Sequence, residues 1–116
     1  MKMHWTIGSA VVLGALVASS AVHAACDVKN GKALYDADCA KCHGKTGDGD
    51  GKLGRSLEHK PTNFNDKAKL AADDVLTKSI RGGSKAIGKS GDMDGFPKYT
   101  DEQIADVIGY LKTLAK

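Results

Sequence analysis

The sequence predicts an all-α protein, on two observations. No stretch of the chain alternates apolar and polar residues for more than a few positions, as a half-buried strand would. Apolar residues instead recur at steps of three and four, which places them on one face of a helix, in the segments 27–39, 73–81 and 100–115. The chain of 116 residues is 41% hydrophobic and 27% charged, which is the composition of one globular domain.

The first 24 residues have the features of a signal peptide. Lys2 precedes an apolar run, residues 7–18, and Val22-His23-Ala24 places small residues at the two positions that signal peptidase reads. An uncleaved membrane anchor is the alternative, but the run is shorter than the roughly 20 residues that a membrane span needs. We therefore expect cleavage after Ala24, a mature domain of residues 25–116, and export to the periplasm.

The net charge argues against one class of partner. The whole chain has a formal net charge of +3, and loss of Lys2 with the signal peptide leaves the rest close to neutral. So small an excess of positive charge does not favour binding to a nucleic acid. Only local basic patches remain to guide docking.

Residues 27–39 predict the first helix, with Val28, Gly31, Leu34 and Tyr35 near one face. A glycine inside a helix costs about 1 kcal/mol relative to alanine. We therefore expect Gly31 to let another backbone approach closely, although a merely tolerated glycine is the alternative.

The first helix leads into the run Cys39-Ala40-Lys41-Cys42-His43. Two thiols three positions apart lie on the same face of a helical turn, so both can add to the vinyl groups of one porphyrin and form thioethers. His43 would project over the tethered ring as the proximal ligand of the iron. The motif therefore predicts a covalently attached haem.

Two other kinds of site use a cysteine pair at this spacing, and neither fits the rest of the chain. A thioredoxin-like redox pair requires a βαβ pattern, for which the sequence shows no strand signal. A structural zinc site requires four well-separated ligands, but His43 adjoins Cys42, and only Cys26 and His59 remain elsewhere in the expected mature domain. The glycine-rich loop 44–54 likewise lacks the strand that must precede a nucleotide-binding motif.

Pro61 breaks the chain after this loop and favours an extended segment before it. A histidine that ligates haem iron normally donates from its other ring nitrogen to a carbonyl or carboxylate. We expect the Pro61 carbonyl to accept that bond from His43, with a simple turn as the alternative. His59 is expected to be an exposed loop residue and is the alternative sixth ligand.

Residues 73–81 predict the second helix, which Gly82 and Gly83 end. Its inward side chains are expected to be Val75, Leu76 and Ile80. Met93 lies in the glycine-rich loop that follows. A thioether is a soft, neutral ligand that suits haem iron opposite histidine, and its polar neighbours argue against the alternative, a core-filling methionine.

Thr100 and Gln103 form a capping box that opens the last helix, which is expected to run to about Ala115. Its apolar stripe comprises Ile104, Val107, Ile108, Leu111 and Leu114, with Tyr110 on the flank. This helix is expected to pack against Gly31 and Tyr35 of the first.

These residues resemble a single-domain class I cytochrome c of the bacterial periplasm, over nearly all of residues 25–116. The resemblance implies the class I cytochrome c fold, about three to five helices wrapped around one covalently attached haem. Gly31, Tyr35 and Tyr110 match the residues at which the family's first and last helices meet. The implied cofactor-binding residues are Cys39, Cys42, His43, Pro61 and Met93, of which His43 and Met93 are the iron ligands. One departure is visible: members of this family often have a proline directly after the methionine, whereas here the next proline is Pro97.

The resemblance further implies a periplasmic electron-transfer protein, not an enzyme, with redox partner proteins and no small-molecule substrate. A membrane-bound oxidase or reductase of a respiratory chain is a possible partner. A docking ring for an acidic partner is one interpretation, and an ordinary solvated surface the other, of Lys45, Lys85, Lys89 and Lys98. The alternative functions are ligand-binding or peroxidase-like chemistry with a labile sixth ligand, and an electron-entry subunit of a larger enzyme.

Cys26 is left over once the haem has consumed two thiols, and an odd cysteine in an exported protein has three possible fates. It can form an intermolecular disulfide, carry a lipid or stay a free thiol. His23 fits poorly the apolar position expected before a lipid-bearing cysteine, so the free thiol is favoured slightly.

Overall fold

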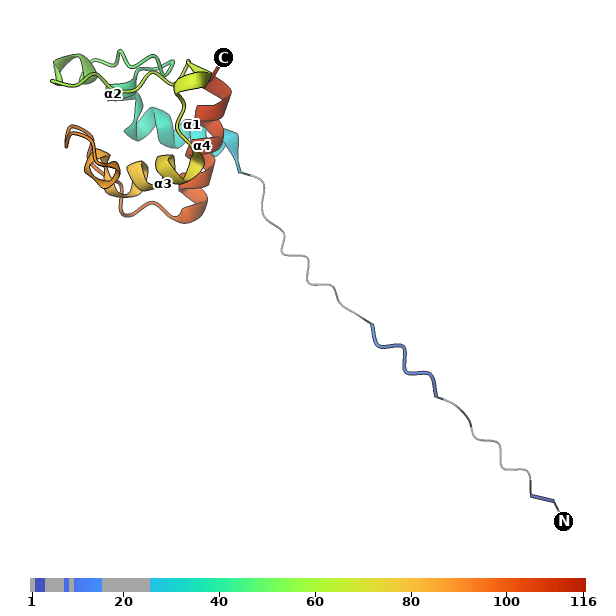
Figure 1. Ribbon diagram of the computed structural model, residues 1–116. Helices are drawn as coiled ribbons and strands as arrows, with labels where there is room; N and C mark the ends of the chain where they lie inside the picture. The colour runs from blue at the N-terminus through green and yellow to red at the C-terminus, as the bar shows by residue number, and fades with distance from the viewer. Residues whose placement is uncertain (1, 4–7, 9, 16–25) are drawn as a thin grey trace.

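A computed structural model describes residues 2–3, 8, 10–15 and 26–116 (Figure 1). The expected cleavage site after Ala24 lies outside the described residues. Residues 10–15 form no helix and their side chains are exposed. Within the described part of the chain, no helix is both long and apolar enough to cross a membrane.

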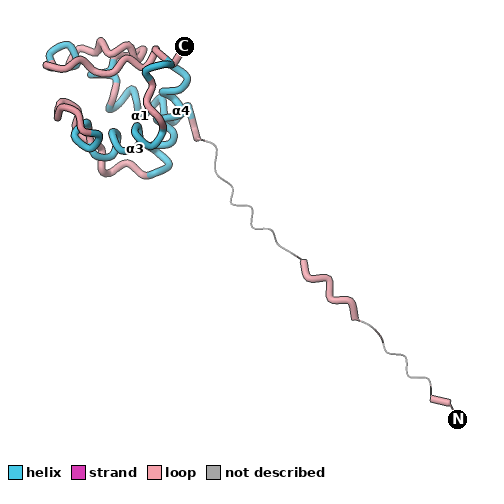
Figure 2. The backbone as a smooth tube through the Cα atoms, in the orientation of Figure 1, coloured by secondary structure: helices cyan, strands magenta, loops and turns pink. Residues whose placement is uncertain are grey.

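The described residues form helices and loops without a strand (Figure 2), which confirms the all-α prediction. The α-helices are α1 (Val28–Asp38), α2 (Ala40–His43), α3 (Asp73–Gly82) and α4 (Asp101–Leu114). Short 3₁₀ turns lie between them, η1 (Gly54–Ser56), η2 (Lys67–Lys69) and η3 (Ser84–Ile87). The three longer helices match the predicted segments to within one or two residues at each end.

Helices α1 and α4, from opposite ends of the domain, cross in contact with each other (Figure 1). Gly31 lies at the crossing, where a methyl group on its Cα would collide with the Asp106 carbonyl oxygen and lie 3.1 Å from the Val107 nitrogen. The close approach predicted for Gly31 is therefore confirmed. The Asp106 side chain also accepts hydrogen bonds from the Asp27 backbone N–H at 2.7 Å and from the Asn30 amide at 2.9 Å.

The core lies where α1, α3 and α4 meet. Tyr35 of α1 is completely buried, and its ring centroid lies 5.2 Å from that of Tyr110 on α4. The other buried apolar side chains are Phe64, Leu76, Ile80, Ile104, Val107, Ile108 and Leu111. The inward faces predicted for both later helices are thus confirmed, except that Val75 and Leu114 are only partly buried.

Capping residues fix the end of α3 and the start of α4, and so help to position the apolar faces of both helices. Thr100 Oγ1 accepts a hydrogen bond from the Gln103 N–H at 3.1 Å, and Gln103 Oε1 accepts from the Thr100 N–H at 2.9 Å. This confirms the predicted capping box, which satisfies two backbone donors at the start of α4. At the end of α3, Gly83 has a φ of 79° and turns the chain away from the helix axis.

Candidate haem site

The run Cys39 to His43, which we term the attachment turn, continues directly from the buried helix α1. The Cys39 N–H donates to the Tyr35 carbonyl at 2.8 Å, and the His43 N–H donates to the Cys39 carbonyl at 2.9 Å. The Tyr35 hydroxyl also donates to the carbonyl of Gly44, the next residue, at 2.6 Å. Both ends of the attachment turn are therefore fixed to α1.

A cavity of about 650 Å³ opens beside the attachment turn. Its lining includes all five residues that the sequence suggested for the cofactor, Cys39, Cys42, His43, Pro61 and Met93. The volume lies within the range of roughly 300–1,000 Å³ that is usual for cofactor and ligand pockets. Two thiols, an imidazole and a thioether around one cavity are the donor set of a covalently attached haem, so the residues present fit that group.

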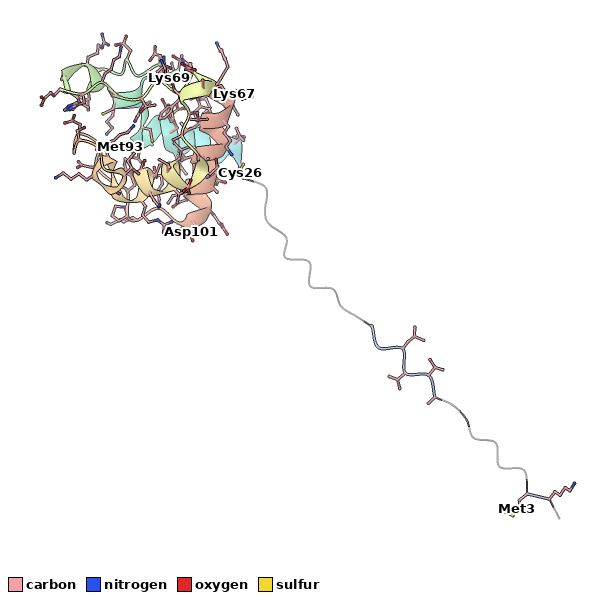
Figure 3. The ribbon with its side chains drawn as sticks, viewed as in Figure 1. Met3, Cys26, Lys67, Lys69, Met93 and Asp101 are labelled. Carbon is pink, nitrogen blue, oxygen red and sulfur yellow. The ribbon has the colours of Figure 1, made fainter. Side chains whose placement is uncertain are left out.

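The two sides of the cavity come from segments far apart in the sequence. The attachment turn and residues 57–62 form one side, and α3 with the loop after η3 forms the other. Figure 3 places Met93 at the open edge of the domain, in the gap between the segment that carries α2 and the segments that follow α3. The two residues suggested as iron ligands thus come from the segments on either side of this gap, His43 from α2 and Met93 from the loop after η3.

His43 is oriented by a backbone carbonyl, as expected, but not by the one expected. Its Nδ1 lies 3.1 Å from the Thr62 carbonyl oxygen, which leaves Nε2 as the nitrogen available to a metal. The ring stacks on Phe64 with centroids 4.5 Å apart. Burial lowers the pKa of His43 and the Thr62 bond opposes that shift, so the net effect favours the neutral imidazole that ligates metals.

The prediction that His43 bonds the Pro61 carbonyl is therefore wrong by one residue, since the acceptor is the carbonyl of Thr62. Successive carbonyls of an extended segment point in opposite directions, and that of Pro61 points toward Gly49, where an added Cβ would lie 2.5 Å from it. The next carbonyl, that of Thr62, then faces His43. Pro61 keeps a place in the lining of the cavity.

His59 is 60% exposed, as expected, and pairs with a residue beside Met93. Its Nδ1 lies 2.7 Å from Oδ2 of Asp92, and both residues line the cavity. The hydrogen bond with His59 lowers the pKa of the Asp92 carboxyl. This bond engages one ring nitrogen of His59 and leaves Nε2 available, so His59 stays the alternative sixth ligand.

Exposed lysines surround the cavity, although not the set that the sequence suggested. Of the four residues suggested for a docking ring, only Lys89 lines the cavity, while Lys45 lies beside a separate surface depression. The exposed lysines that line the cavity, here termed the cavity lysines, are Lys41, Lys60, Lys69 and Lys89. Lys41 lies within the attachment turn itself, so its place could have been predicted from the motif.

Comparisons with known proteins agree with this geometry. Residues 28–115 match the family model of cytochrome c. The chain is 34% identical to cytochrome c-555 of Chlorobaculum tepidum over 104 residues, 89% of this chain and 91% of that protein. It is 31% identical to cytochrome c-555 of Prosthecochloris aestuarii over 91 residues, 73% of this chain and 85% of that protein.

One solved structure, a reducing HAO-like protein complex of Kuenenia stuttgartiensis, contains a similar chain. The likeness has a TM-score of 0.62 at 32% identity and covers 75% of this chain. It covers only 42% of that chain, so the present chain spans less than half of its length. The family model spans nearly all of the described domain, and the helical fold is that of the family, so this chain belongs to the cytochrome c family and is a haem c electron carrier.

Proposed function

We propose that the chain is a periplasmic carrier of single electrons, whose one haem c is tethered through Cys39 and Cys42 and ligated by His43 and Met93. The observation that carries this proposal is the cavity of about 650 Å³ that gathers these four side chains. When bound, the haem supplies an iron that changes between its ferric and ferrous states without making or breaking bonds to a substrate.

The chain's own residues prepare that iron site. The Thr62 carbonyl holds the His43 ring in one orientation and strengthens its basicity as a ligand. Phe64, Leu76 and Ile80 line the cavity and keep water from its inner wall. A dry wall with a thioether opposite an imidazole favours the uncharged, reduced state and therefore a raised reduction potential.

An optical titration tests the proposed ligation. The ferric protein should show a methionine-to-iron charge-transfer band, and the ferrous protein should not bind carbon monoxide readily. Met93→Ala should abolish the band and bind carbon monoxide, because the sixth position on the iron is then open. His59→Ala is the matched control, since it removes the alternative ligand and its bond to Asp92 but keeps Met93, and should keep the wild-type spectrum.

A different result would favour the ligand-binding class of function. If the wild type binds carbon monoxide readily and Met93→Ala does not change that, the sixth position is not occupied by Met93. Loss of the wild-type spectrum in His59→Ala alone would instead assign the sixth position to histidine.

Export rests on the features of residues 1–24, namely Lys2, the apolar run and the small residues before the expected cleavage site. The intact mass of the protein purified from its host tests this directly. Cleavage after Ala24 gives a chain that begins at Ala25 and carries one haem by mass. A mass that includes residues 1–24 would contradict the proposed signal peptide.

A second candidate function is that of an electron-entry subunit, and the likeness to a chain of a reducing HAO-like complex favours it. The two candidates differ in the lifetime of the complex with the partner. Size-exclusion of the untagged protein in a periplasmic extract of its host, followed by haem absorbance, separates them. Elution at the mass of the isolated chain supports a free carrier, and elution at a larger mass supports a subunit.

A further inference from the structure

The loop that carries Met93 is closed at both ends by backbone hydrogen bonds to the end of α3 and the start of η3. At one end, the Lys89 N–H donates to the Ser84 carbonyl at 3.1 Å. At the other, the Phe96 N–H donates to the Ile80 carbonyl at 2.7 Å, and the Ser84 N–H donates to the Met93 carbonyl at 3.0 Å. Ser84 takes part at both ends of the loop.

The Ser84 hydroxyl adds a second link inside the loop. Ser84 Oγ accepts a hydrogen bond from the Met93 N–H at 3.3 Å and donates to the Ser90 carbonyl. The Met93 carbonyl lies farther from Ser84 Oγ, at 3.4 Å. A hydroxyl can accept and donate at the same time. One side chain therefore joins positions 90 and 93 to the end of α3.

Close backbone contacts fix the same arrangement. A Cβ added to Gly83 would lie 2.5 Å from the Met93 carbonyl oxygen, and one added to Gly95 would lie 2.5 Å from the Arg81 carbonyl oxygen. The two backbones therefore pack without side chains between them. Among the described residues, Ser84 supplies the side chain that bonds the Met93 backbone.

The loop needs such a link because its residues can form few apolar contacts of their own. Residues 88–95 comprise three glycines, two aspartates, a lysine and a serine besides Met93 itself, and no proline follows Met93 directly. A loop with few apolar contacts opens easily. Detachment of the thioether from iron requires the Met93 backbone to move away from the cavity, so a bond at that backbone opposes detachment.

We propose that Ser84 is a positioning residue for Met93, whose hydroxyl holds the Met93 backbone where its sulfur can stay on the iron. This inference rests on the proposed ligation by Met93. Carbon monoxide binds only to the fraction of ferrous protein in which Met93 is detached, so the binding rate reports that fraction. The variants are Ser84→Ala, which removes the hydroxyl, and Ser84→Thr, which keeps it.

Ser84→Ala in the holoprotein should bind carbon monoxide about fivefold faster than the wild type, the factor expected for one lost side-chain hydrogen bond. Its methionine-to-iron charge-transfer band should also weaken. Ser90→Ala is the matched control, since the Ser90 hydroxyl bonds Asp92 at 3.2 Å while the Ser90 carbonyl stays available to Ser84. Ser90→Ala and Ser84→Thr should both keep the wild-type rate. Equal rates for Ser84→Ala and Ser90→Ala would overturn the proposal.

A measurement on the unaltered protein covers the case in which Ser84→Ala does not fold. Amide hydrogen exchange in the ferrous protein should show the Met93 N–H exchanging at least about tenfold more slowly than the amides of Asp92 and Asp94. Similar exchange rates at all three positions would overturn the proposal. Met93→Ala, measured in parallel, identifies which idea has failed: an unchanged charge-transfer band there refutes the ligation, and with it the role of Ser84.

Discussion

Tyr35 links the first helix to the attachment turn through a single buried hydroxyl. The bond from this hydroxyl to the Gly44 carbonyl is 2.6 Å long and inaccessible to water. Tyr35→Phe should therefore lower the free energy of unfolding by about 1 kcal/mol, because the buried Gly44 carbonyl loses this bond and keeps only the one from the Gly47 N–H at 3.1 Å. Tyr110→Phe is the matched control, since the hydrogen bonds of the described residues do not include its hydroxyl. Denaturant titration should show a clearly smaller loss for Tyr110→Phe.

The same tyrosine predicts how stability depends on pH. Burial raises the pKa of Tyr35 above its ordinary value, so the folded protein holds this proton more tightly than the unfolded chain. The contribution of Tyr35 is fully present below about pH 10 and is lost progressively as the pH rises above that value. The free energy of unfolding should fall above about pH 10, and less steeply in Tyr35→Phe. Equal slopes for the two proteins would contradict the assignment to Tyr35.

The substitution Gly31→Ala tests the contact between α1 and α4, because the contact decides whether the variant is less or more stable than the wild type. In an open helix, alanine in place of glycine stabilises by about 1 kcal/mol. Here the new methyl group meets the Asp106 carbonyl of α4, and overpacking of this kind costs about 1–3 kcal/mol. Gly31→Ala should therefore destabilise the protein in thermal or denaturant unfolding. A stabilised variant would mean that the two helices are not in close contact at this point.

The reverse substitution at Ala33 supplies the reference value. Ala33 is exposed on the same helix, two residues from Gly31. Ala33→Gly should cost about 1 kcal/mol from helix propensity alone. The difference between the two sites then isolates the effect of the helix crossing.

The helices were predictable because their signals are local, whereas the details of the site depend on contacts that the sequence does not display. The capping box at Thr100 and the apolar spacing of α4 are read within a few residues, and both are confirmed. The sequence predicts the Pro61 carbonyl as the partner of His43, but the structure shows the carbonyl of Thr62, because the Pro61 carbonyl packs against Gly49. The link from Ser84 to Met93 spans nine residues of glycine-rich loop and carries no periodic signal.

The whole domain surrounds its cavity, so the haem-free chain should not keep this fold. Phe64, Leu76 and Ile80 line a cavity of about 650 Å³ in a domain too small to form a large core of its own. Without haem these side chains lose the apolar partner that they would otherwise contact. The far-ultraviolet circular dichroism of the haem-free protein should show little helix. A well-formed helical spectrum would contradict this expectation.

The cavity lysines should direct charged reagents to the opening of the cavity. Raising the salt concentration from roughly 0.01 M to 0.15 M shortens the Debye length from about 30 Å to about 8 Å. Reduction by an anionic reagent such as ferrocyanide should therefore slow with salt, and reduction by a cationic cobalt complex should not. Lys60→Gln should weaken this salt dependence, while Lys45→Gln, away from the cavity, should leave it unchanged. A rate that is independent of salt in the wild type would remove any role for these lysines.

The pairing of the first and last helices has a consequence for the order of events in the life of the chain. Asn30 and Asp106 bond across 76 residues, so α1 cannot find its partner until the final helix has been made. In this fold, burial raises the pKa of the Cys39 thiol to about 12, which leaves almost no reactive thiolate there. We therefore expect the proposed thioether at Cys39 to form while the chain is still open. The last helix then closes over a chain that already holds its porphyrin, in agreement with the low helix content expected of the haem-free protein.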